Sequence, residues 1–303
     1  MKKILVTFLC LPIIGFGQQS KGYDFRPLGV AIGHQTKSNS IVISDIPIYT
    51  WHRGCGPTAL GMIVGYYDLH GFSDLFTDSS FLQTDNINML IASDEHYSDY
   101  SIPLDYYPNL LQDVSDTGTP HQDNSIADFM QTSKSSCGNY WGWSWSSDIG
   151  PAFEDYIYFR NPNYITETSY EYYSANSWDK YKIEIDNNRP VIILVDTDGD
   201  GSTDHFVVGV GYNNANLEFG CYDTWDDSIH WYSWREMDYG VSWGVYGFNK
   251  FSLQNTVVLL EEPEKKEGKY KIIDFLGRKT KKTNQPLIYL YDDGKVEKRI
   301  VIE

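Results

Sequence analysis

Basic residues are scarce in this chain of 303 residues, in which 24 Lys and Arg stand against 41 Asp and Glu and give a formal net charge of −17. A surface this acidic repels a phosphate backbone, so we expect no nucleic-acid partner. The sequence also lacks CxxC and HExxH zinc motifs and a glycine-rich phosphate-binding loop. Any catalytic site must therefore be formed by other residue patterns.

Long hydrophobic runs are absent beyond the N-terminus. There, Lys2 and Lys3 precede a short apolar run at residues 4–16, and small residues stand before Gln18. This pattern predicts a secretory signal peptide over residues 1–17, because the run is too short to span a membrane. A buried N-terminal strand is the alternative. We expect an exported protein, secreted or at the cell surface, with no transmembrane segment in the mature chain.

Cysteine is rare, with four residues in the chain. Cys10 falls in the predicted signal peptide and leaves an odd set of three, so one thiol must stay free or pair between chains. We hypothesise a disulfide between Cys137 and Cys221 and a free thiol at Cys55, although sequence alone does not fix this connectivity.

The cysteine of the segment WHRGCGPTALGMIVGYYDLHG lies between two glycines and just ahead of an apolar helix. Pro57 suits the first turn of a helix, and Leu60, Ile63 and Val64 repeat at helical spacing. The N–H groups and the positive dipole of a helix N-terminus stabilise a thiolate. Cys55 is therefore a candidate nucleophile, against the alternative of a small buried residue at a tight turn.

A nucleophilic thiol needs a base, and His205 stands at the start of the apolar segment HFVVGVGY. Asp223 follows 18 residues later in CYDTW, at the end of the next predicted strand. Two adjacent antiparallel strands would bring both side chains together, so that Asp223 could orient the imidazole. Taken singly, each is also an ordinary strand-end or turn residue. His52, near Cys55 in the sequence, is the second choice of base.

The order of elements is helix-rich first and strand-rich second, which indicates an α+β fold. Helices are predicted near residues 125–132 and 149–160, and in SWDKYKIEIDNNRP, which ends before Pro190. Strands are predicted at SIVISDIPIYTW and then at VIILVD, HFVVGVGY, NLEFGCYDTW and GVYGFNKFSL. The aromatic segments NYWGWSWSSD and SYEYYSANSW either pack in the core or line a substrate cleft.

Three segments, CGPTALGMIVGYYD, DHFVVGVGY and YDTW, resemble the peptidase C39-like branch of the papain-like cysteine peptidases. The resemblance covers residues 46–251. It implies Cys55 as nucleophile, His205 as general base and acid, and Asp223 as orienting residue. It also implies a papain-like fold, in which an N-terminal helix packs on an antiparallel sheet.

The resemblance leaves the oxyanion donor open. These peptidases carry a Gln about six residues before the cysteine, and this chain has Tyr49 at that position. The Tyr49 hydroxyl, the Trp51 indole N–H and a His52 N–H are the candidate substitutes.

The segment DTDGDGSTD, directly before His205, matches positions 1, 3, 5, 6 and 9 of an EF-hand loop. The twelfth position holds Val207 instead of Glu, which excludes a complete EF-hand. A weaker structural calcium site is expected, with a metal-free acidic hairpin turn as the alternative. The candidate calcium ligands are Asp196, Asp198, Asp200, Ser202 and Asp204. The chemistry itself is expected to need no cofactor.

The charge changes sign near residue 261, because residues 264–303 hold 11 Lys and Arg against 7 Asp and Glu. This shift predicts a peptidase domain over residues 18–260, a charged linker at 261–268 and a separate β-rich module at 269–303. The module resembles the C-terminal sorting domain of the Bacteroidetes type IX secretion system in its D-x-L-G-R pattern and basic end, although it is shorter. That resemblance implies the secretion machinery as a partner. A small β appendage of the enzyme is the alternative.

Together these patterns predict a secreted cysteine peptidase that cleaves peptide or protein substrates through a Cys-His-Asp triad and a thioester intermediate. A thiolate–imidazolium pair of Cys55 and His205 would supply the attacking sulfur. Two alternatives stay open: an acyltransferase or amidase with the same triad, and a catalytically inactive, calcium-stabilised binding module.

Overall fold

The computed structural model describes residues 24–35, 39–99, 122–132, 142–255, 270–274, 276–280, 286–292, 294 and 296–300. The chain divides into two compact units, residues 1–256 and 257–303. This division falls close to the domain end predicted at residue 260. The predicted signal peptide, the predicted linker and Cys137 lie outside the described residues.

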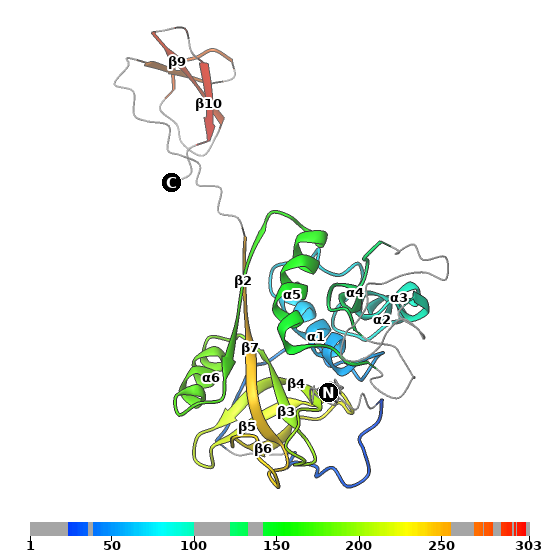
Figure 1. Ribbon diagram of the computed structural model, residues 1–303. Coiled ribbons are helices and arrows are strands. Elements are labelled where there is room, and N and C mark those ends of the chain that lie inside the picture. The colour runs from blue at the N-terminus through cyan, green and yellow to red at the C-terminus, as the bar shows by residue number, and fades with distance from the viewer. Residues whose placement is uncertain are drawn as a thin grey trace, which may run out of the picture. The chain divides into compact units, whose positions relative to one another are not determined.

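The first unit is built on an antiparallel sheet with the strand order β2-β7-β3-β4-β5-β6, and the short strand β1 pairs with β4 (Figure 1). The strands are β1 (Ile41–Val42), β2 (Tyr164–Tyr172), β3 (Val191–Asp196), β4 (His205–Asn213), β5 (Glu218–Tyr222), β6 (His230–Ser233) and β7 (Gly244–Asn255). The central strands β3 and β4 are buried along their whole length. Their continuous apolar sequences are explained by helices that cover both faces of the sheet.

Helices α1 to α5 lie on one side of this sheet and α6 lies on the other (Figure 1). They are α1 (Cys55–Leu69), α2 (Asp85–Ile91), α3 (Asp94–Asp99), α4 (Ile126–Phe129), α5 (Ser146–Arg160) and α6 (Ser177–Asp186). The predicted α+β architecture, with an N-terminal helix packed on an antiparallel sheet, is confirmed. None of the helices in the described part of the chain has the length and apolar character needed to cross a membrane.

Helix α1 is the central helix, and residues 55–68 are all buried. The sequence predicted a single apolar face, but the sheet and helices α2, α4 and α5 cover the helix all round. Small residues permit the close packing. A Cβ on Gly61 would lie 2.8 Å from Ile91 of α2, and one on Gly65 would lie 2.7 Å from the Tyr49 hydroxyl.

Two elements differ from the sequence prediction. SIVISDIPIYTW contributes only the two residues of β1 and then continues as chain tied to β4 by the bond from the Ile43 N–H to the Val210 carbonyl (2.8 Å). The chain leaves the sheet here because it must reach the start of α1. The sequence did not predict β2, an edge strand whose residues are half buried or exposed and which therefore carries no apolar run.

The second unit is a three-stranded antiparallel sheet in the order β10-β9-β8. Its strands are β8 (Tyr270–Ile273), β9 (Pro286–Tyr291) and β10 (Val296–Ile300). The D-x-L-G-R segment is a turn closed by Asp274, whose carboxylate accepts the backbone N–H groups of Leu276 and Arg278, both at 2.9 Å. The predicted β-rich tail is therefore confirmed.

Candidate functional site

Cys55 opens helix α1 and is 2 % exposed. Backbone groups of Phe206, Gly56 and Cys55 itself lie close enough to the sulfur to lower the pKa of the thiol. The N-cap, Gly54, has a φ of 154°, and a Cβ there would lie 2.9 Å from the Gly142 carbonyl oxygen. The turn therefore requires glycine, and it presents the sulfur to the free donors of a helix N-terminus.

His205 is the first residue of β4 and is also buried. Since the backbone of the next residue, Phe206, lies close to the Cys55 sulfur, the strand brings His205 and Cys55 into one site. The His205 ring donates from Nε2 to the backbone carbonyl of Asp223, 2.6 Å away. This bond favours the tautomer in which Nδ1 carries the lone pair and can accept a proton. The structure thus brings the three predicted residues together.

Trp225 covers the imidazole. Its ring stacks on the His205 ring, with centroids 3.9 Å apart and planes at 4°. Its backbone N–H donates to the Asp223 carboxylate at 3.0 Å. The sequence motif YDTW contains this tryptophan, but the motif alone assigned it no role. The stacking fixes the plane of the histidine ring and shields it from water.

The Asp223 carboxylate is not the group that orients His205, which corrects the sequence prediction. It is fully buried and forms an ion pair with Arg26 of the N-terminal segment. The same Arg26 Nη2 lies 3.0 Å from the Asp226 carboxylate and 3.4 Å from His230 Nε2. Asp223 therefore holds the imidazole through its carbonyl oxygen, because its side chain is turned to the guanidinium.

Asp223, Asp226 and His230 place potential ligand atoms within 4.8 Å of one another. In this structure the positive group among them is the Arg26 guanidinium. Burial raises the pKa of Asp223 above its usual range, and Arg26 opposes that shift. No sequence pattern indicates this contact.

Burial also determines the charge state of the candidate pair, Cys55 and His205. It raises the pKa of the Cys55 thiol to about 11, although the nearby backbone groups oppose the shift. It lowers the pKa of His205 to about 4, against the effect of the Asp223 carbonyl. The closed site therefore favours a neutral thiol and a neutral imidazole at pH 7, instead of the expected thiolate–imidazolium pair.

The position of Tyr49 in the structure excludes it as an oxyanion donor. Its side chain is fully buried, and its hydroxyl donates to the Ser80 carbonyl oxygen. The hydroxyl lies over Gly65 of α1. Gly65 is ten residues beyond Cys55, a distance of about 15 Å along a helix. Tyr49 is a core residue, and its hydroxyl cannot reach an oxyanion at Cys55.

His52 contacts Thr58 of α1 and Ala92 at the end of α2. Its backbone N–H donates to the Thr58 hydroxyl at 2.9 Å, and its ring Nε2 lies 3.3 Å from the Ala92 carbonyl oxygen. Both donors are therefore used away from the sulfur. This placement removes His52 as oxyanion donor and as second-choice base.

Trp51 is bound to the loop that follows β5. Its backbone N–H donates to the Thr224 carbonyl at 2.6 Å, which ties the chain before the cysteine to the loop that contains Asp223. Its indole ring lies against Gly142. Of the three candidates, Trp51 is therefore the one that the structure does not exclude as oxyanion donor.

The acidic loop between β3 and β4 brings three of the five predicted calcium ligands together. Asp196, Asp198 and Asp204 place carboxylate oxygens within 4.8 Å of one another. Asp196 also accepts the backbone N–H groups of Gly199 at 2.7 Å and Gly201 at 2.8 Å. The loop therefore brings these three carboxylates close together.

Asp200, another predicted ligand, does not belong to this group. The Ser202 backbone N–H donates to the Asp200 carboxylate at 2.9 Å. Burial raises the pKa of Asp204 to about 7, and the nearby Asp198 adds to that shift. Asp204 directly precedes His205, so the acidic loop leads directly into β4.

The described cysteines, Cys55 and Cys221, are both free and buried. Cys221 lies on β5. Its proposed disulfide partner, Cys137, is outside the described residues, so that pairing stays a prediction.

Residues 43–251 match the profile of the Peptidase_C39 like family. The match covers more than half of the chain and includes Cys55, His205 and Asp223. The chain belongs to this family. The resemblance noted in three short sequence motifs is thereby confirmed over nearly the same range. Membership in this peptidase family supports an enzyme of the cysteine peptidase type with a protein or peptide substrate.

Among solved structures, the chain is similar to Xylellain, a cysteine protease from Xylella fastidiosa, at 14 % identity. The similarity covers 78 % of this chain and 97 % of that chain, with a TM-score of 0.38. At this level it adds nothing to the reasoning about the site. No curated protein sequence matches the chain.

Proposed function

We propose that the protein is a cysteine peptidase that hydrolyses peptide bonds through Cys55 and His205. The proposal rests on the closeness of Cys55 to β4, the strand that begins at His205. The thiol at the N-terminus of α1 lies close to the strand whose first residue is a buried, oriented histidine. A nucleophile, an adjacent base and a third group that orients the base are the parts that covalent acyl transfer needs.

In the acylation step, neutral His205 takes the thiol proton at Nδ1 while the Cys55 sulfur attacks the carbonyl carbon of the peptide bond. The Cys55 backbone N–H donates to the oxyanion. Protonated His205 then gives its proton to the leaving amine as the C–N bond breaks, and a thioester remains. In deacylation, His205 takes a proton from the water that attacks the thioester. It returns that proton to the sulfur as the carboxylic acid leaves.

Cleavage of a peptide mixture in H₂¹⁸O tests this function. Hydrolysis places one ¹⁸O atom in each new carboxyl group, which mass spectrometry of the products detects. Unlabelled products joined to an added amine would assign the site to acyl transfer instead. A native protein that yields no product, and in which iodoacetamide leaves Cys55 unmodified, would contradict the enzyme and favour a binding module.

We also propose that the acidic loop binds Ca²⁺ and orders the strand that carries His205. Three carboxylates, of Asp196, Asp198 and Asp204, lie within 4.8 Å of one another. Ca²⁺ prefers such oxygen ligands. Burial raises the pKa of Asp204 to about 7, and the nearby Asp198 and Asp196 carboxylates add to that shift. A bound ion would offset the repulsion among the three carboxylates.

Millimolar Ca²⁺ is expected to raise Tm relative to EDTA, because an ion that binds only the folded chain stabilises it. Asp198→Asn should reduce this increase. Asp200→Asn, an exposed change in the same loop but outside the group of three, should preserve it. Thermal melting of the three proteins with and without Ca²⁺ makes the comparison. Equal Tm values for the native protein in EDTA and Ca²⁺ would rule out the site.

We further propose that the protein is exported through its signal peptide and then by type IX secretion machinery. The support is the sequence of residues 1–17 and the D-x-L-G-R pattern of residues 269–303, whose described strands form a separate small sheet. In a bacterium that has this machinery, protein in the medium should begin at Gln18, and a variant without residues 269–303 should stay in the periplasm. A cell-associated product that begins at Met1 would contradict export.

A further inference from the structure

The antiparallel sheet has two edge strands, and another segment of the described chain covers one of them. The strand order places β6 at one edge and β2 at the other. At β6, the Trp231 N–H donates to the His34 carbonyl of the N-terminal segment at 2.9 Å. Within the described residues, β2 pairs with β7 alone. In this part of the chain, β2 is therefore the open edge of the sheet.

The register of β2 determines which of its backbone groups point outward. Tyr173 follows the strand, and its N–H donates to the carbonyl of Tyr246, the next residue in register, at 2.9 Å. Antiparallel partners alternate between hydrogen-bonded and non-hydrogen-bonded pairs, and the register with β7 is unbroken. Every second residue before Tyr173 therefore turns its N–H and C=O away from β7. These residues include Thr166, Thr168, Tyr170 and Tyr172.

β2 lacks most of the features that protect an edge strand from further pairing. Protected edge strands are short, or they contain proline, lysine or a β-bulge. β2 has nine residues, with the sequence YITETSYEY, and pairs with β7 without a shift of register. By contrast, the register shifts where β3 pairs with β7 and where β4 pairs with β5. The open edge is therefore long and regular enough to pair with a further strand.

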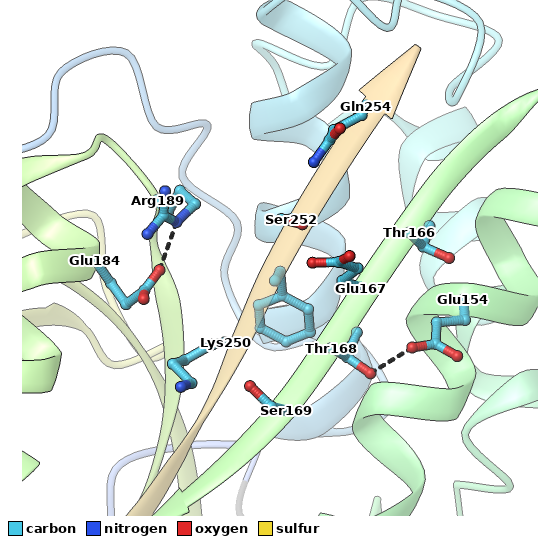
Figure 2. Close-up of a pocket in the computed structure, with 11 residues that line it drawn as sticks. Glu154, Thr166, Glu167, Thr168, Ser169, Glu184, Arg189, Lys250, Ser252 and Gln254 are labelled. Atoms are coloured by element: carbon cyan, nitrogen blue, oxygen red, sulfur yellow. Dashed lines mark hydrogen bonds and ion pairs between the residues drawn. The ribbon is translucent and has the colours of Figure 1, made fainter. Parts of the chain in front are cut away.

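Open space lies along this edge. Figure 2 shows a groove of about 730 Å³ that is lined by side chains from both faces of β2. On the face toward α5, the Thr168 hydroxyl donates to the Glu154 carboxylate at 2.6 Å, and Glu167 belongs to the opposite face. A pocket of about 300 Å³ continues along the strand, because Thr168 and Ser169 line both spaces. An added chain therefore has room beside β2.

The charge around the open edge is mostly negative. β2 and α5, which packs against it, contain five acidic residues and one basic residue. The acidic residues are Asp148, Glu154, Asp155, Glu167 and Glu171. The basic residue, Arg160, donates to the Asp74 carbonyl at 3.3 Å. On the far side of the groove, Arg189 pairs with Glu184 at 2.5 Å (Figure 2), which leaves Lys250. Basic side chains of an added strand would therefore be attracted.

Two side chains of β2 are available to such a strand. Glu167 is exposed, and within the described residues it forms no hydrogen bond or ion pair, whereas Glu171 pairs with Lys180 at 2.5 Å. The Tyr172 ring is 62 % exposed, and aromatic faces attract Lys and Arg side chains. A second copy of this chain fits less well, because the acidic residues of two β2 strands would repel each other.

We propose that β2 binds an extended segment of another polypeptide, rich in lysine or arginine, as an additional strand of the sheet. The backbone of this segment pairs with the outward N–H and C=O groups of Thr166, Thr168 and Tyr170. Its basic side chains lie near Glu167 and Tyr172. Main-chain hydrogen bonds supply the affinity, and the acidic and aromatic side chains select a basic sequence. This surface does not depend on the proposed chemistry of Cys55.

A fluorescent nonapeptide of alternating Lys and Thr tests the surface by fluorescence anisotropy. The full chain is used as Cys55→Ala, which prevents cleavage of the probe. We expect saturable binding, and about tenfold weaker binding of the matched peptide of alternating Glu and Thr. Thr166→Pro removes an outward N–H and should weaken binding about tenfold, whereas Thr166→Ala should not. Glu167→Gln should weaken it about two- to fivefold, and Glu95→Gln, an exposed change in α3, should have no effect.

Amide hydrogen exchange, measured residue by residue, locates the peptide without any substitution in β2. The amides of Thr166 and Thr168 should exchange about tenfold more slowly with the peptide than without it. Those of Glu167 and Ser169, which bond to β7, should be slow in both states.

Four results would overturn the proposal: no binding of the basic peptide up to about 1 mM, equal binding of the two peptides, unchanged binding by a folded Thr166→Pro protein, and unchanged exchange at Thr166 and Thr168. None of them bears on the peptidase proposal, because the protein carries Cys55→Ala throughout.

Discussion

Replacing Cys55 with Ala is expected to abolish peptide hydrolysis, with kcat/KM falling on the order of 10⁴-fold or more. The sulfur forms the thioester, and the other described thiol, Cys221, is buried within β5. The change removes one buried sulfur atom and leaves the N–H donors of the helix in place. The fold should therefore persist, which circular dichroism and melting can verify.

His205→Ala should cause a loss of the same order, because the neutral imidazole is the base that takes the thiol proton. Incorporation of ¹⁸O into products measures both variants. Cys221→Ala is the matched control, since it removes a buried thiol outside the site and should retain activity. Turnover within about tenfold of native in folded Cys55→Ala or His205→Ala would contradict the mechanism.

The pH profile of the native enzyme is an independent readout of the same histidine. Burial lowers the pKa of His205 to about 4, so the ring remains a competent base down to about that pH. Activity should hold between about pH 5 and 6, where a histidine with an ordinary pKa of about 6.5 would be largely protonated. It should fall as the pH approaches 4. An acid limb centred near 6.5 would mean that the working imidazole is exposed to water.

The parts of this site that the sequence predicts are those set by local or nearest-neighbour geometry. Cys55 follows from glycines and a proline ahead of an apolar helix. His205 and Asp223 follow from two consecutive antiparallel strands, and the observed register pairs Val208 with Tyr222, which brings the strand ends together. Such relations depend on the periodicity of helices and strands, which the order of residues encodes directly.

The parts that the sequence does not predict depend on contacts between distant residues. Arg26 lies 197 residues from Asp223, in a segment without periodic pattern, and its guanidinium decides which oxygen of Asp223 faces the imidazole. Tyr49 shows the same limit. Its distance in sequence from Cys55 fits an oxyanion donor, but the close approach at Gly65 buries it in the core.

Replacing Arg26 with Gln is expected to lower the free energy of unfolding by about 3 kcal/mol, because the Asp223 carboxylate is fully buried and loses its cation. Urea or thermal unfolding measures the loss. Lys180→Gln is the control, since it breaks the exposed pair with Glu171, whose atoms lie 2.5 Å apart, and should cost less than about 1 kcal/mol. An equally small loss for Arg26→Gln would show that the N-terminal segment is not held at the site.

Combining Arg26→Gln with Asp223→Asn tests whether the side-chain carboxylate or the backbone carbonyl of Asp223 orients His205. The double variant removes both charges of the pair and should recover most of the lost stability. Asparagine keeps the backbone carbonyl that accepts the His205 Nε2–H, so kcat/KM should stay within about tenfold of native. That result would assign the orienting role to the backbone. A folded double variant as inactive as His205→Ala would mean the opposite: in the working enzyme the carboxylate leaves Arg26 and turns to the imidazole.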